Sequence, residues 1–298
     1  MDQPFIEQVR SFNRLVTLRT GALNDSYLGR GRPLGQARLL FEIGPDGSDI
    51  RSLRERLGLD SGYISRLLKS LETEGLVAVQ SDSSDRRRRR VALTAKGRSE
   101  HAAYDMLSDD LAQSLLGSLT ASQRDRLLAA MAEVETLMTA ASVTIGVEPQ
   151  DSQDALRCLA AYFKELDERF EKGFDPTKGG YAGEKSSAQP TDCFMIARLN
   201  GRAIGCAALK PIDASTSEIK RMWVAPEARG LGVARRLLEA IENQARQSGV
   251  TRVVLDTNRA LTEAQALYRK AGYRETDRYN DNPYAHFWFE KELGGAKP

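Results

Sequence analysis

The sequence predicts an α/β and α+β multidomain chain, with a mostly helical domain at 1–141 and a domain of mixed strands and helices at 142–298. Three observations support this fold class. The chain has 298 residues, which exceeds what one average hydrophobic core accommodates. Apolar residues recur at helical spacing up to about residue 140. Beyond residue 143, short apolar runs alternate with helical stretches, a pattern typical of α/β architecture.

Composition and charge indicate a soluble, cytoplasmic protein. Hydrophobic residues make up 41% of the chain and charged residues 28%. No apolar run approaches the roughly 18 residues of a membrane span, and the first residues lack the basic and apolar regions of a secretion signal. The three cysteines are far apart, which favours buried thiols over disulfides. No cluster of ligand residues predicts a metal site.

The N-terminal domain contains helix signals followed by signals for a two-stranded hairpin. We expect a helix that ends at Gly58 and a second one over 61–74, which Asp60 caps. Strands follow at 76–80 and 91–93, joined by a polar loop. Helix, turn, helix and then hairpin is the order of a winged helix-turn-helix.

The second of these helices separates an apolar from a polar face. Its buried stripe comprises Ile64, Leu67, Leu68 and Leu71. The opposite face carries residue types that reach base edges and phosphates, namely Ser61, Gly62, Ser65, Arg66 and Lys69. An ordinary solvated face is the alternative. The five arginines at 86–90 favour DNA contact, since a basic hairpin can lie along a minor groove. We expect Arg86, Arg87, Arg88 and Arg89 to contact DNA, whereas strand alternation turns Arg90 elsewhere.

Several segments of this domain occur in a specific order, namely Asp60 to Leu68, Leu71-Glu72-x-x-Gly75-Leu76-Val77, Asp85-Arg86-Arg87 and Leu93-Thr94-x-Lys96-Gly97. Over about residues 5–140 the chain resembles the MarR family of transcriptional regulators. The resemblance implies a homodimer built from the first and last helices of this domain. It also implies binding to a palindromic site in double-stranded DNA, with one recognition helix per half-site. The extra wing arginines predict strongly salt-dependent binding.

The C-terminal domain begins with a hairpin signal, Asn200-Gly201 between two apolar runs. Further along the chain we expect strands at 218–224, 252–256 and 285–291 and helices at 232–247 and 262–271. Between the first of these strands and the first helix lies a glycine-containing loop, Arg229, Gly230, Leu231, Gly232, Val233 and Ala234. Glycines let backbone N–H groups approach an anion, and a helix N-terminus favours negative charge. The loop therefore predicts a phosphate cradle, with a tight strand-to-helix turn as the alternative.

The full pattern Arg-x-x-Gly-x-Ala, preceded by Glu218 to Val224 and followed by Asn258 and by Ala266 to Tyr273, resembles the GNAT family of N-acetyltransferases over about residues 143–293. The resemblance implies that the pyrophosphate of acetyl-CoA sits on the loop. It further implies that the pantetheine arm pairs with Met222, Trp223 and Val224. Asn258 would contact the pantetheine, and Tyr268 would lie near the sulfur.

Amine acetylation requires a neutral amine, a polarised thioester and a protonated leaving thiolate. An alkyl amine has a pKa of roughly 10, so a base should help at neutral pH. Glu218 is the candidate base, with a surface carboxylate paired with Lys220 as the alternative. Tyr268 is the candidate acid, with a core tyrosine as the alternative. The N–H of Val224 could hold the thioester oxygen.

Substrate contacts are less well specified. Candidates that could select a cation or an aromatic group are Glu165, Phe174, Asp175, Tyr279 and Tyr284. The resulting hypothesis is a transcriptional regulator that is also an acetyl-CoA-dependent N-acetyltransferase, acting by direct attack of the primary amine of a small molecule or amino acid. One alternative is a regulator whose second domain only senses acyl-CoA, and another is a first domain that only dimerises. Whether acetyl-CoA changes DNA affinity stays open.

Overall fold

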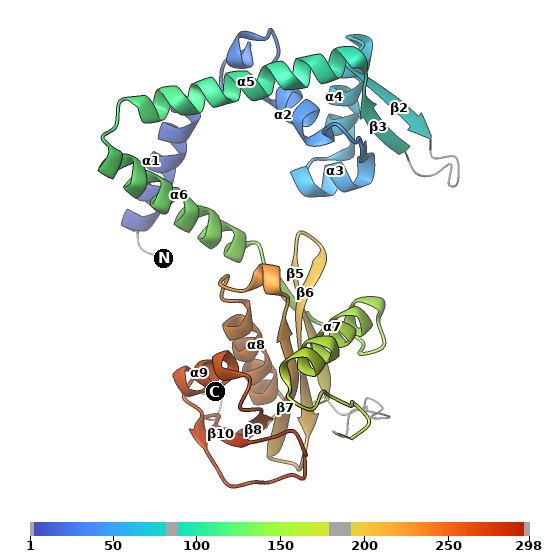
Figure 1. Cartoon of the computed structure of the whole chain (residues 1–298), viewed down its shortest axis with the longest axis vertical. Coiled ribbons are helices and arrows are strands. Elements are labelled where there is room, and N and C mark those ends of the chain that lie inside the picture. Colours follow the sequence, from blue (N-terminus) through green and yellow to red (C-terminus); the bar gives the residue numbers. More distant parts are fainter. Residues whose placement is uncertain (1–2, 82–88, 179–191, 295–298) are drawn as a thin grey trace. The chain divides into compact units, whose positions relative to one another are not determined.

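The computed structural model describes residues 3–81, 89–178 and 192–294, which belong to two compact units, Met1–Leu128 and Ala129–Pro298 (Figure 1). The division falls inside a helix, ahead of the boundary predicted at residue 141. The domain boundary at residue 141 therefore stays a prediction.

The N-terminal unit has the element order of the predicted winged helix-turn-helix. Asp49 accepts a hydrogen bond from the Ser52 N–H and begins the first helix of the motif, and Asp60 does the same from the Tyr63 N–H for the second. The elements are α1 (Gln3–Arg19), η1 (Tyr27–Gly29), α2 (Leu34–Ile43), β1 (Ser48–Asp49), α3 (Ile50–Leu57), α4 (Ser61–Thr73), β2 (Val77–Ser81), β3 (Arg89–Leu93), α5 (Ala95–Gly117) and α6 (Ala121–Ala141), whose last residues belong to the other unit.

A small sheet and helices α2, α3, α4 and α5 enclose the core of this unit. The sheet has the order β1-β3-β2 with antiparallel neighbours. The stripe predicted for α4 is buried against α2, α3 and the sheet. At the start of α5, a Cβ on Gly97 would stand 1.9 Å from the carbonyl oxygen of Leu76, so the helix can approach the sheet this closely only with glycine there.

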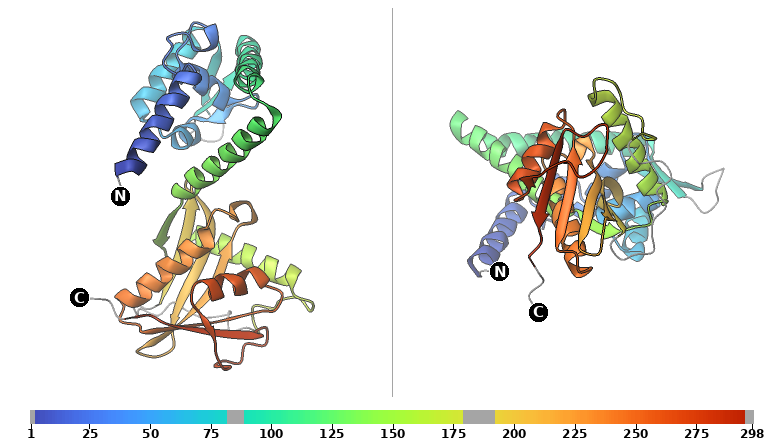
Figure 2. Two further views of the ribbon diagram at one scale, coloured as in Figure 1. Left: turned by 90° about the vertical axis from the view of Figure 1, so that its left-hand side faces the viewer. Right: turned by 90° about the horizontal axis from the view of Figure 1, so that it is seen from below.

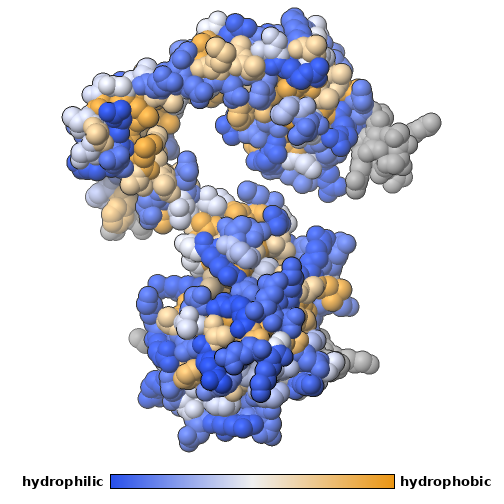
Figure 3. Space-filling model, viewed as in Figure 1, coloured by the Kyte–Doolittle hydropathy of each residue, from blue (hydrophilic) through white to orange (hydrophobic). Residues whose placement is uncertain are grey.

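The first and last helices of the N-terminal half carry apolar residues that a single chain does not bury. Neither α1 nor α6 contains a buried residue. Val9 is 59% exposed on α1, and Met131 is 51% exposed on α6. Figure 3 shows apolar side chains at the surface of this half of the chain. The predicted helices are confirmed, but their apolar stripes do not pack into the core of either unit.

The C-terminal unit is built on a seven-stranded sheet with the order β4-β5-β6-β7-β8-β10-β9. Only β7 and β8 run parallel. The elements are β4 (Thr144–Val147), α7 (Gln153–Arg169), β5 (Cys193–Leu199), β6 (Arg202–Pro211), β7 (Thr216–Val224), η2 (Pro226–Ala228), α8 (Val233–Gln247), β8 (Arg252–Thr257), α9 (Thr262–Lys270), β9 (Arg274–Glu275) and β10 (Phe287–Glu292). Of these elements, β4, α7 and β9 are not predicted from the sequence.

Alternation along the strands divides the core of this unit into two layers. Met195 and Ala197 of β5 pack with α8, whereas Phe194 and Ile196 pack with α7. Figures 1 and 2 show these two helices on opposite faces of the sheet. The predicted hairpin between β5 and β6 is confirmed, and both turn residues have positive φ, 51° at Asn200 and 79° at Gly201.

Strands β7 and β8 separate partway along their length, which leaves a gap in the hydrogen bonding of the sheet. The two strands pair only where Thr216 to Glu218 face Arg252 to Val254. Beyond that point β7 continues to Val224 on the edge of β6 alone, past an irregularity in register and a left-handed residue, Arg221, with φ of 56°. The backbone of β7 that faces β8 is therefore left without a strand partner in its second half.

Candidate functional site

The polar face predicted on α4 is exposed as a unit. Ser61, Gly62, Ser65, Arg66 and Lys69 all lie on the surface, opposite the buried stripe. The guanidinium of Arg66 lies 5.9 Å from the ring centroid of Tyr63, which supports the arginine side chain at the surface. Among the predicted wing contacts, Arg89 is exposed at the start of β3. Arg86, Arg87 and Arg88 lie outside the described residues.

In the C-terminal unit, the glycine-containing loop forms an open cradle at the start of α8. Gly230 and Gly232 have φ of 84° and 71°, and no atom lies within 4 Å of where their Cβ would stand. No side chain caps this end of the helix. The first helical bond runs from the Arg236 N–H to the Gly232 carbonyl, so the N–H groups of Val233, Ala234 and Arg235 have no acceptor within the helix. Such a terminus suits an anion.

A cavity of about 540 Å³ lies against this cradle. Its wall includes residues of β7, of the loop, of α7 and of α9. Met222, Trp223 and Val224, predicted to carry the pantetheine, line it together with Arg229, Gly230, Gly232, Val233 and Ala234. Leu231, also predicted, is partly buried against the core instead of lining the cavity. The loop with its backbone donors and the edge of β7 that lacks a strand partner therefore both border this cavity.

Glu165 of α7 connects residues of the cavity wall through hydrogen bonds. One carboxylate oxygen, Oε2, accepts hydrogen bonds from the Trp223 Nε1 at 2.8 Å and from the Arg229 Nη2 at 2.5 Å. The other oxygen accepts from the Arg169 Nη1 at 3.3 Å. Arg169 also donates to the carbonyl of Ala260, at 2.7 Å, which ties α7 to the segment before α9. Glu165, predicted to contact substrate, thus lies in the wall of the loop cavity with both oxygens engaged.

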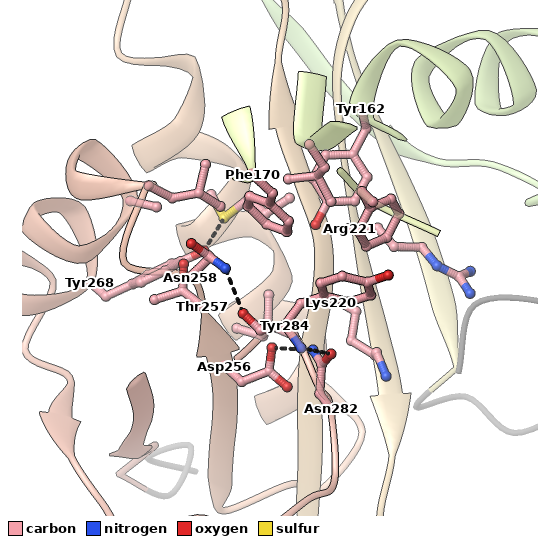
Figure 4. A pocket seen from close by; sticks show the side chains of 16 residues that line it. Tyr162, Phe170, Lys220, Arg221, Asp256, Thr257, Asn258, Tyr268, Asn282 and Tyr284 are labelled. Atoms are coloured by element: carbon pink, nitrogen blue, oxygen red, sulfur yellow. Dashed lines mark hydrogen bonds between the residues drawn. The ribbon is translucent and has the colours of Figure 1, made fainter. Parts of the chain in front are cut away.

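A second cavity, of about 60 Å³, adjoins the first (Figure 4). Both are lined by Met222 and Tyr268. In Figure 4, Tyr162 and Phe170 lie at one end of the small cavity, Asp256 lies at the other, and Tyr284 lies between them. The small cavity therefore has an aromatic end and a polar end, and it meets the larger cavity at the predicted acid.

Tyr268 is buried at the junction of the two cavities. Its hydroxyl points at the Met222 Sδ, 3.8 Å away. Burial raises the pKa of this phenol well above its usual value, and the negative charge of Asp256 raises it further. The phenol is consequently protonated throughout the neutral range and can donate a proton. The alternative of a core tyrosine is correct about burial, but a core position alone does not explain why the residue lines both cavities.

Glu218 lies at the point where β7 and β8 separate. It is 9% exposed, and burial raises the pKa of its carboxyl. Its Oε1 accepts from the Tyr279 hydroxyl at 2.9 Å and from the Asn280 Nδ2 at 3.0 Å, while its Oε2 pairs with the Lys220 Nζ at 3.3 Å. The alternative of a surface carboxylate is right about the pairing with Lys220 and wrong about exposure. Glu218 does not line either cavity.

Of the remaining predicted contacts, the structure brings only some to the small cavity. Phe174 and Tyr284 line it, with ring centroids 4.9 Å apart. Asn258 lines it too, but its amide donates to the Tyr284 carbonyl and accepts from the Ala260 N–H. Asp175 lies outside, because its carboxylate accepts from the N–H and hydroxyl of Thr177. Tyr279 also lies outside the small cavity.

Sequence reasoning missed the polar end of the small cavity. Asp256 ends the apolar run of β8, and a carboxylate that closes a buried strand is a signal that was available. Its Oδ1 accepts from the Asn282 Nδ2 at 3.0 Å, and its Oδ2 accepts from the Asn280 Nδ2 at 2.6 Å. Burial raises the pKa of Asp256. No signal pointed to Asn282, since its position depends on how the segment before β10 folds back.

Comparisons with known proteins agree with both halves of this description. The model of the acetyltransferase (GNAT) family matches residues 159–273, and the MarR family model matches residues 30–88. An IAA acetyltransferase of Azospirillum brasilense is 41% identical over 98 residues, which cover 33% of this chain and 63% of that protein. An uncharacterized N-acetyltransferase of Schizosaccharomyces pombe is 31% identical over 142 residues, covering 45% of this chain and 83% of the relative.

Solved structures similar to the chain fall into the same two groups. A GNAT acetyltransferase of Staphylococcus aureus matches with a TM-score of 0.45 and 17% identity, over 51% of this chain and 99% of that one. A probable transcriptional regulator of Pseudomonas aeruginosa matches with a TM-score of 0.38 and 23% identity, over 44% of this chain and 98% of that one. From the family models and the relatives, the chain belongs to the GNAT acetyltransferase family and carries a MarR-family region ahead of the acetyltransferase domain.

Among the described residues, no helix combines the length and apolar character needed to cross a bilayer. Over those same residues, no group of three or more His, Cys, Asp or Glu side chains is arranged to hold a metal ion. The three cysteines, Cys158, Cys193 and Cys206, are buried free thiols as predicted.

Proposed function

We propose that the C-terminal unit transfers an acetyl group from acetyl-CoA to the primary amine of a small molecule or amino acid, by direct attack of the amine. The N-terminal half binds double-stranded DNA as a homodimer. One observation carries the enzyme proposal: two cavities meet at Tyr268. The larger cavity is bordered by the open anion cradle, and the smaller one by the carboxylate of Asp256.

The residues present fit acetyl-CoA. The N–H groups at the start of α8 and the open glycines Gly230 and Gly232 suit a pyrophosphate. The edge of β7 from Met222 to Val224, free of β8, offers backbone donors and acceptors to the amides of a pantetheine arm. When bound, acetyl-CoA supplies the acetyl thioester. Arg229, oriented by Glu165, closes one wall around it.

The chemistry of this chain's own residues follows from that arrangement. Attack on the thioester carbon requires a neutral amine, and departure of the sulfur requires a proton. Tyr268, held protonated by burial, gives the proton to the leaving sulfur. A carboxylate beside the small cavity removes the proton from the amine. Glu218 is the carboxylate that the sequence predicts, and it lies one amide away from the cavity, through Asn280. The N–H of Val224 as donor to the thioester oxygen stays a prediction.

The lining of the small cavity favours a compact amine with an apolar substituent. Phe174 lies 5.9 Å from Phe170 and 4.9 Å from Tyr284, ring centroid to centroid, so three rings form one wall. Asp256 is fixed at the polar end. A carboxylate opposite aromatic faces attracts an ammonium group and its hydrocarbon neighbours. We therefore expect aryl or alkyl amines that carry no charge other than the ammonium to be better acceptors than polyanionic ones.

Thiol release with a panel of arylalkyl amines, amino acids and polyamines tests the enzyme proposal. We expect acetyl-CoA-dependent turnover with at least one compact primary amine, and mass spectrometry should find the acetylated product. Tight binding of acetyl-CoA without turnover of any amine would instead support a unit that only senses acyl-CoA. A matched control is the same assay with desulfo-CoA in place of acetyl-CoA, which must release no thiol.

The DNA-binding proposal is supported by the exposed face of α4 and by the apolar residues left exposed on α1 and α6. Apolar side chains that gather on exposed helices are typical of subunit interfaces. Sedimentation should give a dimer, and binding to a fragment of the protein's own upstream region should weaken steeply with salt. A monomer, or a salt-insensitive affinity, would contradict this part of the proposal.

A further inference from the structure

Two carboxylates lie near the small cavity, and they differ in what they can reach. Asp256 lines the cavity that Tyr268 also lines, whereas Glu218 does not line it. Asp256 stands on β8 just past the last residue paired with β7, where the two strands separate. A group that removes a proton from the acceptor must be within hydrogen-bond reach of the acceptor nitrogen. An acceptor amine in the small cavity would contact Asp256 directly, whereas Glu218 is not part of the lining.

The hydrogen bonds of Asp256 fix its carboxylate and leave it able to accept more. Each oxygen receives one amide donor, from Asn282 at 3.0 Å and from Asn280 at 2.6 Å. An ionised carboxylate offers about four acceptor sites, so roughly two stay available for an incoming N–H. Glu218 is more fully engaged, since one oxygen takes two donors and the other pairs with Lys220.

The charged and titratable groups around Asp256 come from two neighbouring elements. Glu218 and Lys220 of β7 and Tyr268 of α9 interact with it electrostatically. Burial raises the pKa of Asp256, while Asn280, Asn282 and Lys220 act in the opposite direction. Burial is the largest of these influences, so the pKa of Asp256 lies above its usual value, and a rise in this direction makes a carboxylate a stronger base.

We propose that Asp256 is the catalytic residue that accepts the proton of the acceptor ammonium, and that Glu218 is a positioning residue that acts through Asn280. The inference rests on the proposed acetyl transfer. Asp256 takes one proton from the ammonium and later passes it to water. The nitrogen of the neutral amine then bonds to the acetyl carbon as the carbon–sulfur bond breaks. Tyr268 gives its proton to the sulfur and regains one from the nitrogen, so a single proton is released overall.

Asn280 is the residue that joins the two carboxylates. Its Nδ2 donates both to Glu218 Oε1 at 3.0 Å and to Asp256 Oδ2 at 2.6 Å, and its Oδ1 accepts from the Trp288 Nε1 at 3.0 Å. With its oxygen held by Trp288, the amide can only present its NH₂ group to the carboxylates. Glu218 thereby orients the amide that orients Asp256, which is a role that glutamine can partly fill.

The test compares D256N with E218Q, using D213N, in the exposed loop between β6 and β7, as the matched control. The acceptor is the best amine of the screen together with β-fluorinated analogues, whose amines are less basic. For the basic amine at neutral pH, D256N should lower kcat/KM by about 10²–10⁴-fold. The loss should shrink for the least basic analogue, because that amine is already neutral. E218Q should lose less than about tenfold, and D213N nothing.

The pH profile separates a base from a structural support. Wild type and E218Q should show a limb in which kcat/KM rises as Asp256 ionises, and D256N should lack that limb. If E218Q loses the limb and D256N keeps it, Glu218 is the base and the inference is wrong. If D256N folds poorly, D256A with added formate serves the same purpose: restored turnover there, without restoration of E218A, supports the inference, and the reverse contradicts it. Failure of the wild-type enzyme to acetylate any amine would overturn the proposed function itself, a distinct result.

Discussion

The two candidate sites of this chain are assembled in opposite ways. The DNA contacts proposed for the recognition helix of the N-terminal unit come from one face of α4 and lie within nine residues, from Ser61 to Lys69. The small cavity of the C-terminal unit collects residues from four separate segments, at 162–174, 219–222, 256–268 and 282–284. A surface on one helix is set by local periodicity, whereas a cavity depends on how distant segments fold together.

A paired carboxyl of the N-terminal unit and the two carboxyls beside the small cavity of the C-terminal unit have pKa values shifted in opposite directions. In the N-terminal unit, the Arg30 guanidinium hydrogen bonded to Glu100 lowers the pKa of that carboxyl, and Arg32 lowers it further. In the C-terminal unit, burial raises the pKa of Glu218 and of Asp256. Lowered carboxyl pKa values accompany ion pairs that support a fold, whereas raised ones suit groups that exchange protons. The comparison predicts that variants of the C-terminal site should lose catalytic activity, whereas variants of the N-terminal unit should lose DNA affinity or stability.

The largest expected effect is on the chemistry at the junction of the cavities. Tyr268→Phe removes the hydroxyl and keeps the ring that packs against Tyr273 and Phe289. We expect kcat to fall by about 10²–10⁴-fold with little change in KM for acetyl-CoA or in the melting temperature. Steady-state kinetics with the best amine measures this. An unchanged kcat would assign the leaving-group proton to another donor, most simply water.

The next effect is on DNA binding. Arg66→Ala removes a guanidinium from the exposed face of α4 and should weaken specific binding by about 1–3 kcal/mol, or about 5- to 150-fold. Arg157→Ala, which removes the same charge from α7 in the other unit, is the matched control and should leave DNA affinity unchanged. Fluorescence anisotropy with an upstream fragment measures both. Equal losses in the two variants would mean that net charge, and not the face of α4, governs binding.

Much of the fold follows from sequence because its signals are local. Capping by Asp60 and the turn at Asn200-Gly201 are confirmed, since each depends on a few adjacent residues. The elements that the sequence does not predict depend on contacts with distant segments of the chain. The edge strand β4 is only four residues long and carries no apolar alternation strong enough to be recognised before its pairing with β5 is known.

The candidate site likewise contains residues whose role follows from local sequence and residues whose role depends on distant partners. The loop from Arg229 to Ala234 could be read from sequence, because its chemistry lies in its own backbone. The roles expected for Glu165 and Asp175 could not be judged, since each carboxylate is engaged by residues that the sequence does not place nearby, Trp223 and Arg229 in one case and Thr177 in the other. Asp256 could not be predicted, because an isolated acidic residue at a strand end is recognisable as part of a site only once the donors to its carboxylate, Asn280 and Asn282, are known.

A smaller effect tests the cradle against an equally strained position. Gly232→Val and Gly249→Val place a branched side chain at φ of 71° and 81°, at the two ends of α8, and in both cases the space around the Cβ is open. Each should cost about 1–3 kcal/mol of stability. Only Gly232→Val should also raise the KM for acetyl-CoA, by about tenfold. If both variants raise KM equally, distortion of α8 and not the cradle explains the effect.

The smallest expected effect concerns the ion pairs of the N-terminal unit. Glu100 pairs with Arg30 at 2.6 Å and with Arg32 at 2.8 Å, and these arginines hold the pKa of Glu100 below its usual value. A carboxyl with a lowered pKa in the folded state stabilises the protein above its unfolded pKa, and this stabilisation is lost as pH falls through the folded value. Glu100→Gln should therefore cost about 1 kcal/mol or less at pH 7, because the pairs are partly exposed, and progressively less in acid. Thermal melts of both proteins between neutral and acidic pH measure this. A difference that stays constant with pH would show that Glu100 acts through packing and not through its charge, and would remove the electrostatic contrast between the two units.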